Sequence, residues 1–246
     1  MFSQQTRCIY RNNQLAEVIC QLRFPEILSI ETELPAAFQE EIRDVFPRFS
    51  QRKEGLPGKQ NNNYQFATAD GLARVNLTSR FISLAISRYQ SWEAFARLLD
   101  KPLAAFIRIY KPAYFERVGL RYLNFISRRE LGLEHLPFRE LISGCYLGIL
   151  SQEEVAENTT IRCTTDADFA LRGGCRCKLH AGPGSVRRPG KQDPEVKFIL
   201  DLDLYMPGNV ELQLSAGALE TLHGQSYGLF RGAITDTLHE ALDPDE

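Results

Sequence analysis

The chain has 246 residues and an ordinary globular composition, with 43% hydrophobic and 24% charged residues. Its formal net charge of −2 argues against a protein that mainly grips nucleic-acid backbone, which usually needs a strong basic surplus. The opening residues lack the apolar core of a signal peptide, and no run approaches the roughly 18 apolar residues of a membrane span. Six cysteines without an export signal predict free thiols in a reducing compartment. We therefore expect a cytoplasmic protein without a membrane partner.

The first half of the chain predicts elements in the order strand, helix, three strands, helix. Apolar residues alternate over 15–24, which is typical of a half-buried strand. A short helix follows, which Pro35 opens and Pro47 ends. Three further strands, bounded by turn signals, are predicted over 64–68, 72–78 and 81–88.

Glycine or proline residues guide the prediction for two other segments of this half. The polar stretch 51–63 is rich in Gly and Asn and is expected to be a loop. A helix follows the third of the three strands, with Ser91 as its N-cap and an apolar face from Trp92 to Tyr110. Pro102 lies inside this helix, so we expect a kink or a break there.

The second half repeats the same order between Tyr114 and Leu242. A long strand over 114–126 precedes a short helix near 137–142. Alternating apolar residues then predict strands over 159–171, 175–181 and 196–206. A final helix over 218–242 is predicted from its apolar stripe.

Two runs of strands, each followed by a long helix, favour an α+β fold over a parallel βαβ sheet. We expect a tandem pseudo-repeat, with halves 1–112 and 113–246 in one compact unit. Each half would form a curved antiparallel sheet with its long helix packed across one face, and the two sheets would form one surface if they join. The duplication depends on element order and not on residue identity, and such orders also recur by chance.

A cysteine cluster has the residue types of a zinc site: Cys163, Cys175, Cys177 and His180. On a strand, however, Cys175 and Cys177 point to one face and His180 to the other. The two cysteines share their face with apolar residues and are expected in the core, where free cysteines behave as small hydrophobes. We predict no metal and no cofactor.

Catalytic motifs are missing from the sequence. The four histidines show no metal-protease spacing, and His223 and His239 are expected in surface or capping roles on the last helix. The sequence contains no nucleophile elbow, no phosphate-binding loop and no dinucleotide glycine motif. No catalytic residue is predicted, and the question of enzymatic activity stays open, leaning toward none.

The stretch 182–195 is rich in Pro and Gly and connects two predicted strands. Arg187, Arg188 and Lys191 make it basic. It is expected to be a mobile, solvated loop. The alternative is a finger for a phosphate, a nucleic-acid backbone or an acidic partner.

Charges gather on one face of the three predicted strands of the second half. They are Arg162, Asp166, Asp168, Arg176, Lys178, His180, Asp201 and Asp203. Opposite charges on neighbouring strands pair well and keep a solvent-facing sheet soluble. The alternative is a face that lines a groove for a polar ligand or another protein, with Arg176 and Lys178 as contact residues.

Arg117 and Arg121 share one face of the strand 114–126. The rise of an extended strand places them roughly 13 Å from each other. Gly119 lies between them, and a glycine inside a strand marks a bulge or a close approach by another group. Either the two arginines hold an anionic ligand, which Asn124 helps to orient, or they pair internally with Glu17 or Glu116.

Several segments together resemble a known family. They are Leu15-x-Glu17-Val18 with Arg23-Phe24, Ser91-Trp92-x-x-Phe95, and Arg117-x-Gly119-Leu120-Arg121-Tyr122-x-Asn124. Over nearly the whole chain, they are similar to a sporadically distributed family of uncharacterised bacterial proteins. The resemblance implies a bacterial origin and a shared architecture, and it brings no activity. Its patchy occurrence is typical of genes that travel, as those of phage-defence and CRISPR-associated loci do.

We therefore predict a non-enzymatic binding or regulatory protein, an accessory component of such a defence locus, that presents a sheet face to a partner protein. One alternative is a small anionic-ligand binding protein or hydrolase with its site near Arg117 and Arg121. Another is nucleic-acid binding through the basic residues 187–191.

Overall fold

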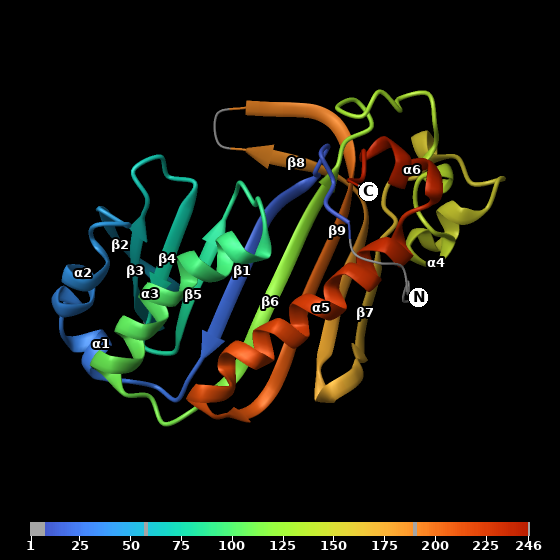
Figure 1. Cartoon of the computed structure of the whole chain (residues 1–246). Helices are drawn as coiled ribbons and strands as arrows, with labels where there is room; N and C mark the ends of the chain where they lie inside the picture. Colours follow the sequence, from blue (N-terminus) through green and yellow to red (C-terminus); the bar gives the residue numbers. More distant parts are fainter. Residues whose placement is uncertain (1–7, 57–58, 189–190, 246) are drawn as a thin grey trace.

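A computed structural model describes residues 8–56, 59–188 and 191–245 (Figure 1). They form an α+β fold around one nine-stranded antiparallel sheet, with the strand order β2-β3-β4-β5-β1-β6-β9-β8-β7. The strands are β1 (Leu15–Arg23), β2 (Arg48–Leu56), β3 (Lys59–Ala67), β4 (Ala73–Leu77), β5 (Phe81–Ile86), β6 (Phe115–Ile126), β7 (Thr165–Ala170), β8 (Arg176–Arg188) and β9 (Lys191–Val210). The helices are α1 (Ser29–Thr32), α2 (Ala36–Ile42), α3 (Trp92–Tyr110), α4 (Gly144–Leu147), α5 (Ser215–Ala233) and α6 (Asp236–Ala241).

Strands β1 and β6 lie side by side at the centre of the sheet. Val18 of β1 is opposite Tyr122 of β6, and Cys20 is opposite Leu120. The predicted boundary at 112/113 falls between α3 and β6. Strands from both sides of that boundary are therefore hydrogen-bonded into one continuous sheet.

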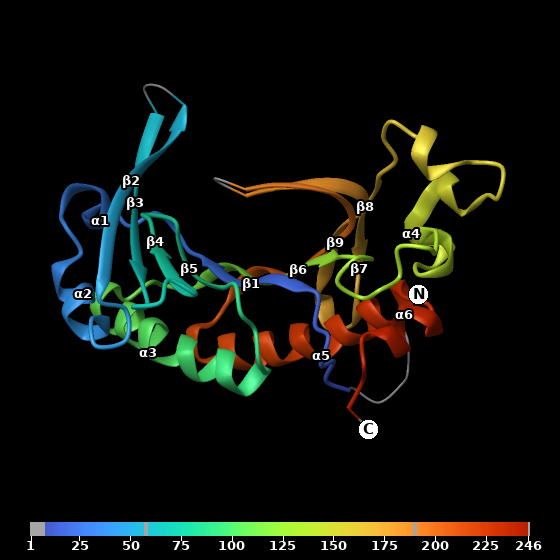
Figure 2. The same ribbon diagram turned by 90° about the horizontal axis from the view of Figure 1, so that it is seen from above.

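The long helices α3 and α5 lie on the same side of the sheet (Figure 2). Helix α5 contacts β6 and β9, while α3 contacts β5 and α2. The strand residues that face these helices are apolar and buried: Val18, Cys20, Leu22, Leu84, Val118, Leu120, Leu202, Leu204 and Cys177. Because successive side chains alternate between the faces of a strand, the intervening residues lie on the opposite, helix-free face. We call these two sides the helix face and the open face.

The stretch 51–63 was predicted as a loop, but its residues 51–56 and 59–63 belong to the hairpin of β2 and β3; residues 57–58 lie outside the described part of the chain. The two strands pair from Arg48 opposite Ala67 to Leu56 opposite Lys59. Polar groups support the pairing, since Gln51 Nε2 donates to Asn62 Oδ1 at 3.0 Å. The hairpin projects away from α3 and α5 (Figure 2), so it has few apolar positions from which alternation could be recognised.

The stretch 182–195 was also predicted as a loop, but its residues 182–188 and 191–195 belong to a ribbon in which β8 and β9 continue past the sheet; residues 189–190 are not described. The ribbon bends and projects on the open-face side (Figure 2). At Gly182 a Cβ atom would lie 2.4 Å from the carbonyl oxygen of Cys163, so only glycine allows this close crossing. The base of the ribbon is held by Lys197, whose side chain is only 7% exposed and contacts Glu130, Asp193 and Glu195 at 3.2–3.8 Å.

Of three predictions about the helices, the N-cap of α3 is confirmed, whereas the break at Pro102 and the single final helix are not. Ser91 caps α3 as predicted, since its hydroxyl accepts from Ala94 N at 3.2 Å. Pro102 does not split α3, which continues to Tyr110. The single final helix is divided at Ile234, which is extended and bridges to Ile142. Thr235 then caps the separate helix α6.

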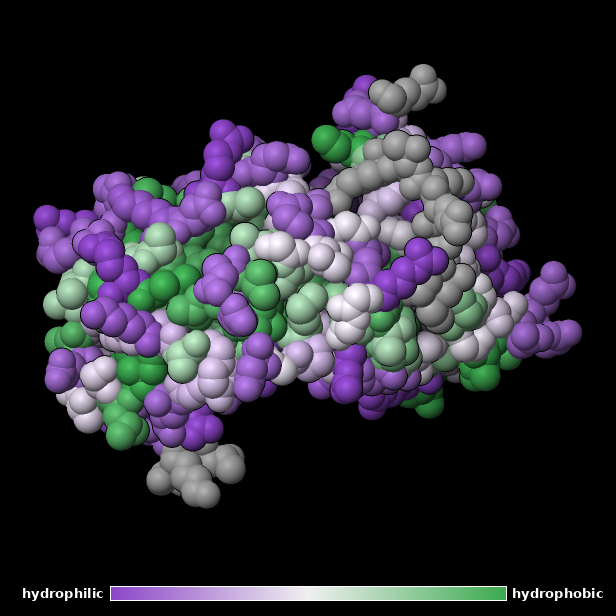
Figure 3. All heavy atoms as spheres, turned by 60° about the horizontal axis from the view of Figure 1, so that its bottom comes forward, coloured by the Kyte–Doolittle hydropathy of each residue, from purple (hydrophilic) through white to green (hydrophobic). Residues whose placement is uncertain are grey.

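Figure 3 shows the molecule with its lower side in Figure 1 turned forward. Apolar residues gather over the half that carries α1–α3 and β2–β5. Exposed apolar side chains of this half include Leu28, Leu34 and Phe49. Within the described part of the chain, no helix is long and apolar enough to cross a membrane.

Candidate functional site

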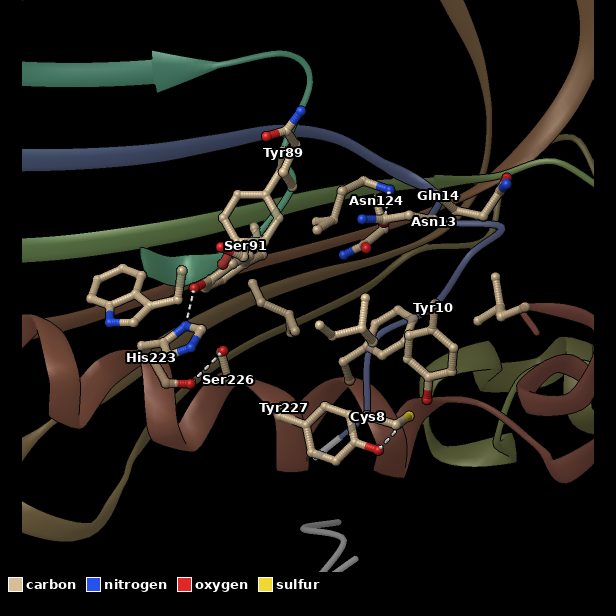
Figure 4. Close-up of a pocket in the computed structure, with 18 of the residues that line it drawn as sticks. Cys8, Tyr10, Asn13, Gln14, Tyr89, Ser91, Asn124, His223, Ser226 and Tyr227 are labelled. Carbon is tan, nitrogen blue, oxygen red and sulfur yellow. Dashed lines mark hydrogen bonds between the residues drawn. The ribbon is translucent and has the colours of Figure 1, made fainter. Parts of the chain in front are cut away.

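The helix face contains a pocket of about 330 Å³ between α3, α5 and the central strands (Figure 4). The first turn of α3 and the residues before it form one wall, and α5 forms the opposite wall. Strands β6 and β9 form the floor through Tyr122, Asn124 and Leu202. The segment 8–15 lines the remaining side. The site is therefore built from stretches that are far apart in sequence.

Aromatic rings form the wall where α3 and α5 approach each other. The Trp92 ring stacks on His223 with centroids 4.3 Å apart and planes 11° apart. The Tyr122 hydroxyl is 2.6 Å from His223 Nδ1, and Trp92 Nε1 donates to Glu220 Oε1 at 2.7 Å. These bonds fix the two polar rings, so the wall presents a preorganised aromatic surface.

Asn124 supplies a buried amide on the sheet side of the pocket. Its residue is 2% exposed, and its Nδ2 donates to the carbonyl oxygen of Leu200 at 3.1 Å. Within the described residues this is its one side-chain hydrogen bond, so Oδ1 and the second N–H make none. Buried amides normally satisfy most of their hydrogen-bonding groups. Figure 4 places Asn124 across the pocket from His223 and Ser226 of α5.

The segment 8–14 crosses the pocket and pairs with the end of the chain. Backbone bonds join Arg11 N to Asp243 O and Asn12 N to Leu242 O, both at 3.0 Å. The Tyr10 hydroxyl is 2.9 Å from His239 Nδ1, and its ring packs edge-on against Phe230. Burial raises the pKa of Tyr10 strongly, so this hydroxyl stays protonated. We call residues 8–14 the strap.

The lining of the pocket is nearly free of formal charge. Among the lining residues that the structure describes, none is lysine or arginine, and Glu93 is the one carboxylate. Ser226 donates its hydroxyl hydrogen bond to the carbonyl oxygen of His223 at 2.7 Å. The hydroxyl proton is therefore directed to the backbone and not to the imidazole, which differs from the nucleophile–base arrangement of hydrolases.

The predicted residues Arg117 and Arg121 lie on the open face, away from the pocket. Arg117 pairs with Asp203 at 2.6 Å, and Arg121 makes a two-pronged contact with Asp201. The hydrogen bond to Asp201 raises the pKa of Arg121. Internal pairing was one of the two expectations, but the partners are aspartates of β9 and not Glu17 or Glu116. Asn124 lies on the other face, so the three residues do not converge.

Gly119 is explained by a close approach, as the sequence suggested. A Cβ atom there would lie 2.1 Å from an Nη atom of Arg117. The Arg117 side chain crosses this position, where it also lies over the Tyr205 ring at 4.6 Å. The glycine therefore gives the guanidinium room to reach Asp203.

Arg176 and Lys178 are exposed on the open face of β8. Lys178 is opposite Asp168 on one side and Asp203 on the other. His180 Nδ1 is 2.7 Å from Asp166. The predicted charged face thus exists on β7, β8 and β9, although Arg162 precedes β7. Arg187 and Arg188 are in β8, but the structure does not describe their side chains.

The cysteine cluster is distributed as the strand argument predicted. Cys175 and Cys177 are buried in the core, and burial raises the pKa of the Cys20 and Cys177 thiols to about 12. Among the described residues, no three His, Cys, Asp or Glu side chains form a group that fits a metal ion.

Neither protein-family models nor curated protein sequences give a match to this chain. The site is therefore interpreted from its own geometry.

Sequence reasoning missed most of the pocket. His223, expected at the surface or in a capping role, is buried and stacked on Trp92. Trp92 and Tyr122 were recognised only as apolar positions. One signal was present: Asn124 occupies a position of β6 that alternation assigns to the apolar face. A polar residue at a buried position indicates that hydrogen-bond partners are present there.

Proposed function

We propose that the protein is a non-enzymatic binding protein that holds a small, uncharged ligand in the pocket between α3 and α5. The observation that carries this proposal is the buried amide of Asn124 within an aromatic, almost charge-free pocket. Ligand sites are typically concave and mostly apolar, with a few polar groups that orient the ligand. A pocket whose described lining contains no lysine or arginine favours a neutral ligand over the anion that the arginines of β6 suggested.

Trp92 provides a direct test, because it is the single tryptophan of the chain and lines the pocket. We expect small neutral aromatic or aliphatic fragments to change its fluorescence and to raise the melting temperature in the same order. Free N-acetyltryptophanamide, titrated in parallel, controls for absorption by the fragment. If a chemically diverse fragment set produced neither change, the proposal would be wrong.

A second candidate function uses the open face. Both projecting ribbons, β2–β3 and β8–β9, lie on that side of the sheet (Figure 2). Arg176 and Lys178 of β8 are exposed on the same face. This arrangement supports a regulatory role in which the face binds a partner protein. Co-elution with the products of neighbouring genes in size-exclusion chromatography is expected, and Arg176→Glu with Lys178→Glu should abolish it. Unchanged co-elution of this double variant would exclude the face.

We also propose that the two halves of the sheet are related by duplication. Counting outward from the centre, β1, β5, β4 and β3 have the positions that β6, β9, β8 and β7 have in the other half. This order supports descent of both halves from one unit, with β2 as an addition. The association with a mobile bacterial defence locus stays a prediction, which the resemblance alone supports.

A further inference from the structure

We propose that the pocket binds an uncharged, planar heteroaromatic molecule of the nucleobase or nucleoside class. This proposal rests on the binding function proposed above and names its ligand. Three properties of the described lining lead to it: the rings, the amide of Asn124 and the absence of cations.

The rings favour a planar ligand. The rings that line the space come from the strap, the start of α3 with the segment before it, and α5: Tyr10, Tyr89, Trp92 and Phe230. Tyr122 lies between them on the floor, edge-on to Tyr89 at 6.2 Å. Aromatic side chains stack on any flat π-system, and each stacked base contributes substantially to binding.

The amide of Asn124 distinguishes a heterocycle from a hydrocarbon. An acyl chain or a simple phenyl ring would leave Oδ1 and one N–H of this buried side chain without partners, which is unfavourable. A nucleobase edge offers a donor beside an acceptor, and asparagine pairs with such an edge through both of its groups. Asn13 lies next to Asn124 (Figure 4); its Oδ1 accepts from Leu15 N, which leaves its Nδ2 to donate.

Charge and size set the limits of the ligand. Phosphate recognition normally uses arginine, lysine or a helix N-terminus, and the described lining contains neither cation. The Ser91 hydroxyl already caps α3, and Glu93 follows it, which repels an anion. The volume of about 330 Å³ is at the small end of ligand sites. A free base or nucleoside fits these limits better than a nucleotide.

Isothermal titration calorimetry of the full chain tests the ligand class. The probes are adenosine, guanosine, cytidine and uridine, with AMP as the phosphate-bearing analogue and 1-decanol as a neutral aliphatic molecule. We expect at least one nucleoside to bind more tightly than decanol, and AMP to bind more weakly than adenosine.

Two substitutions connect binding to the amide. Asn124→Leu removes both hydrogen-bonding groups at similar volume, and Asn124→Asp keeps the shape but replaces the amide by a charge. Each should weaken nucleoside binding about 10- to 100-fold, the value of one lost bidentate contact. Asn124→Leu should leave decanol binding equal or tighter, which a collapsed pocket would not. Asn76→Asp on the open face is the matched control and should bind nucleosides normally.

Several results would overturn the ligand class. They are decanol binding more tightly than every nucleoside, AMP matching adenosine, or Asn124→Leu binding nucleosides as the wild type does. The absence of measurable binding by all four nucleosides would also overturn it. If neutral fragments still change Trp92 fluorescence in that case, the proposed binding function stands; if they do not, both proposals fail.

Discussion

The two faces of strand β6 differ in how their polar side chains are paired. On the open face, Arg117 and Arg121 are the most conspicuous charges, yet each is paired with an aspartate of β9. On the helix face, Leu120 and Tyr122 are buried, and Asn124, which lines the pocket beside Tyr122, keeps part of its amide unpaired. Recognition is therefore better sought where a buried polar group is left without a partner than where charges are most numerous.

The sharpest contrast between the faces is in packing. Leu120→Ala should lower the free energy of unfolding by about 2–5 kcal/mol, because it empties a fully buried position beneath α5. Leu123→Ala, on the half-buried open face of the same strand, is the control and should cost clearly less. Urea unfolding measures both. Equal losses would mean that the open face is packed as a second core.

A smaller effect is expected at the ring cluster of the pocket. Tyr122→Phe removes the hydroxyl near His223 Nδ1 and should cost about 1–2 kcal/mol of unfolding free energy, since a buried partner loses its bond. The emission of Trp92, stacked on the same histidine, should shift as well. Tyr205→Phe on the open face serves as control, because its hydroxyl makes no hydrogen bond within the described residues. A Trp92 spectrum unchanged in Tyr122→Phe would contradict the coupling.

The ion pairs of the open face should matter less than their number suggests. Asp201→Asn should cost about 1 kcal/mol, the upper end of the range for exposed pairs, because the Arg121 side chain is 43% exposed and the Asp201 side chain 15% exposed. The loss should shrink further at high salt, where exposed charges are screened. A large, salt-independent loss would show that this pair belongs to the core and would weaken the contrast between the faces.

The smallest effect concerns the strap over the pocket. Burial, together with the charge of Arg231, lowers the pKa of His239 below its usual 6.5. The folded state therefore prefers the neutral ring, and its contribution is present above pH 6.5 and lost as the pH falls through the folded-state pKa. His239→Gln should make the melting temperature less sensitive to acidification in this window. An identical pH profile would show that His239 does not stabilise the strap through Tyr10.

The regular parts of the fold could be predicted because their residues carry local signals. Alternation indicated β1, β6 and the central part of β9, and Ser91 marked the start of α3. The projecting parts of the β2–β3 and β8–β9 ribbons, within the stretches 51–63 and 182–195, were missed because they leave the helix-covered part of the sheet and carry few apolar residues from which alternation could be recognised. Gly182 was interpreted as a loop residue, whereas it allows the close crossing at the base of the ribbon.

The pocket could not be predicted for a different reason. Trp92, Asn124 and His223 are separated by tens of residues, and only the packing of α3 and α5 on one sheet brings them together. Composition instead drew attention to Arg117 and Arg121, whose partners Asp201 and Asp203 are equally distant in sequence. Register across β6 and β9 was needed to see that these charges are satisfied.

The most direct test of the account is a crystal structure of the full chain soaked with the fragments that change Trp92 fluorescence. The account predicts a ligand between α3 and α5, stacked on the ring cluster and hydrogen-bonded to the amide of Asn124. Ligand found only on the open face, against Arg117 and Arg121, would contradict it.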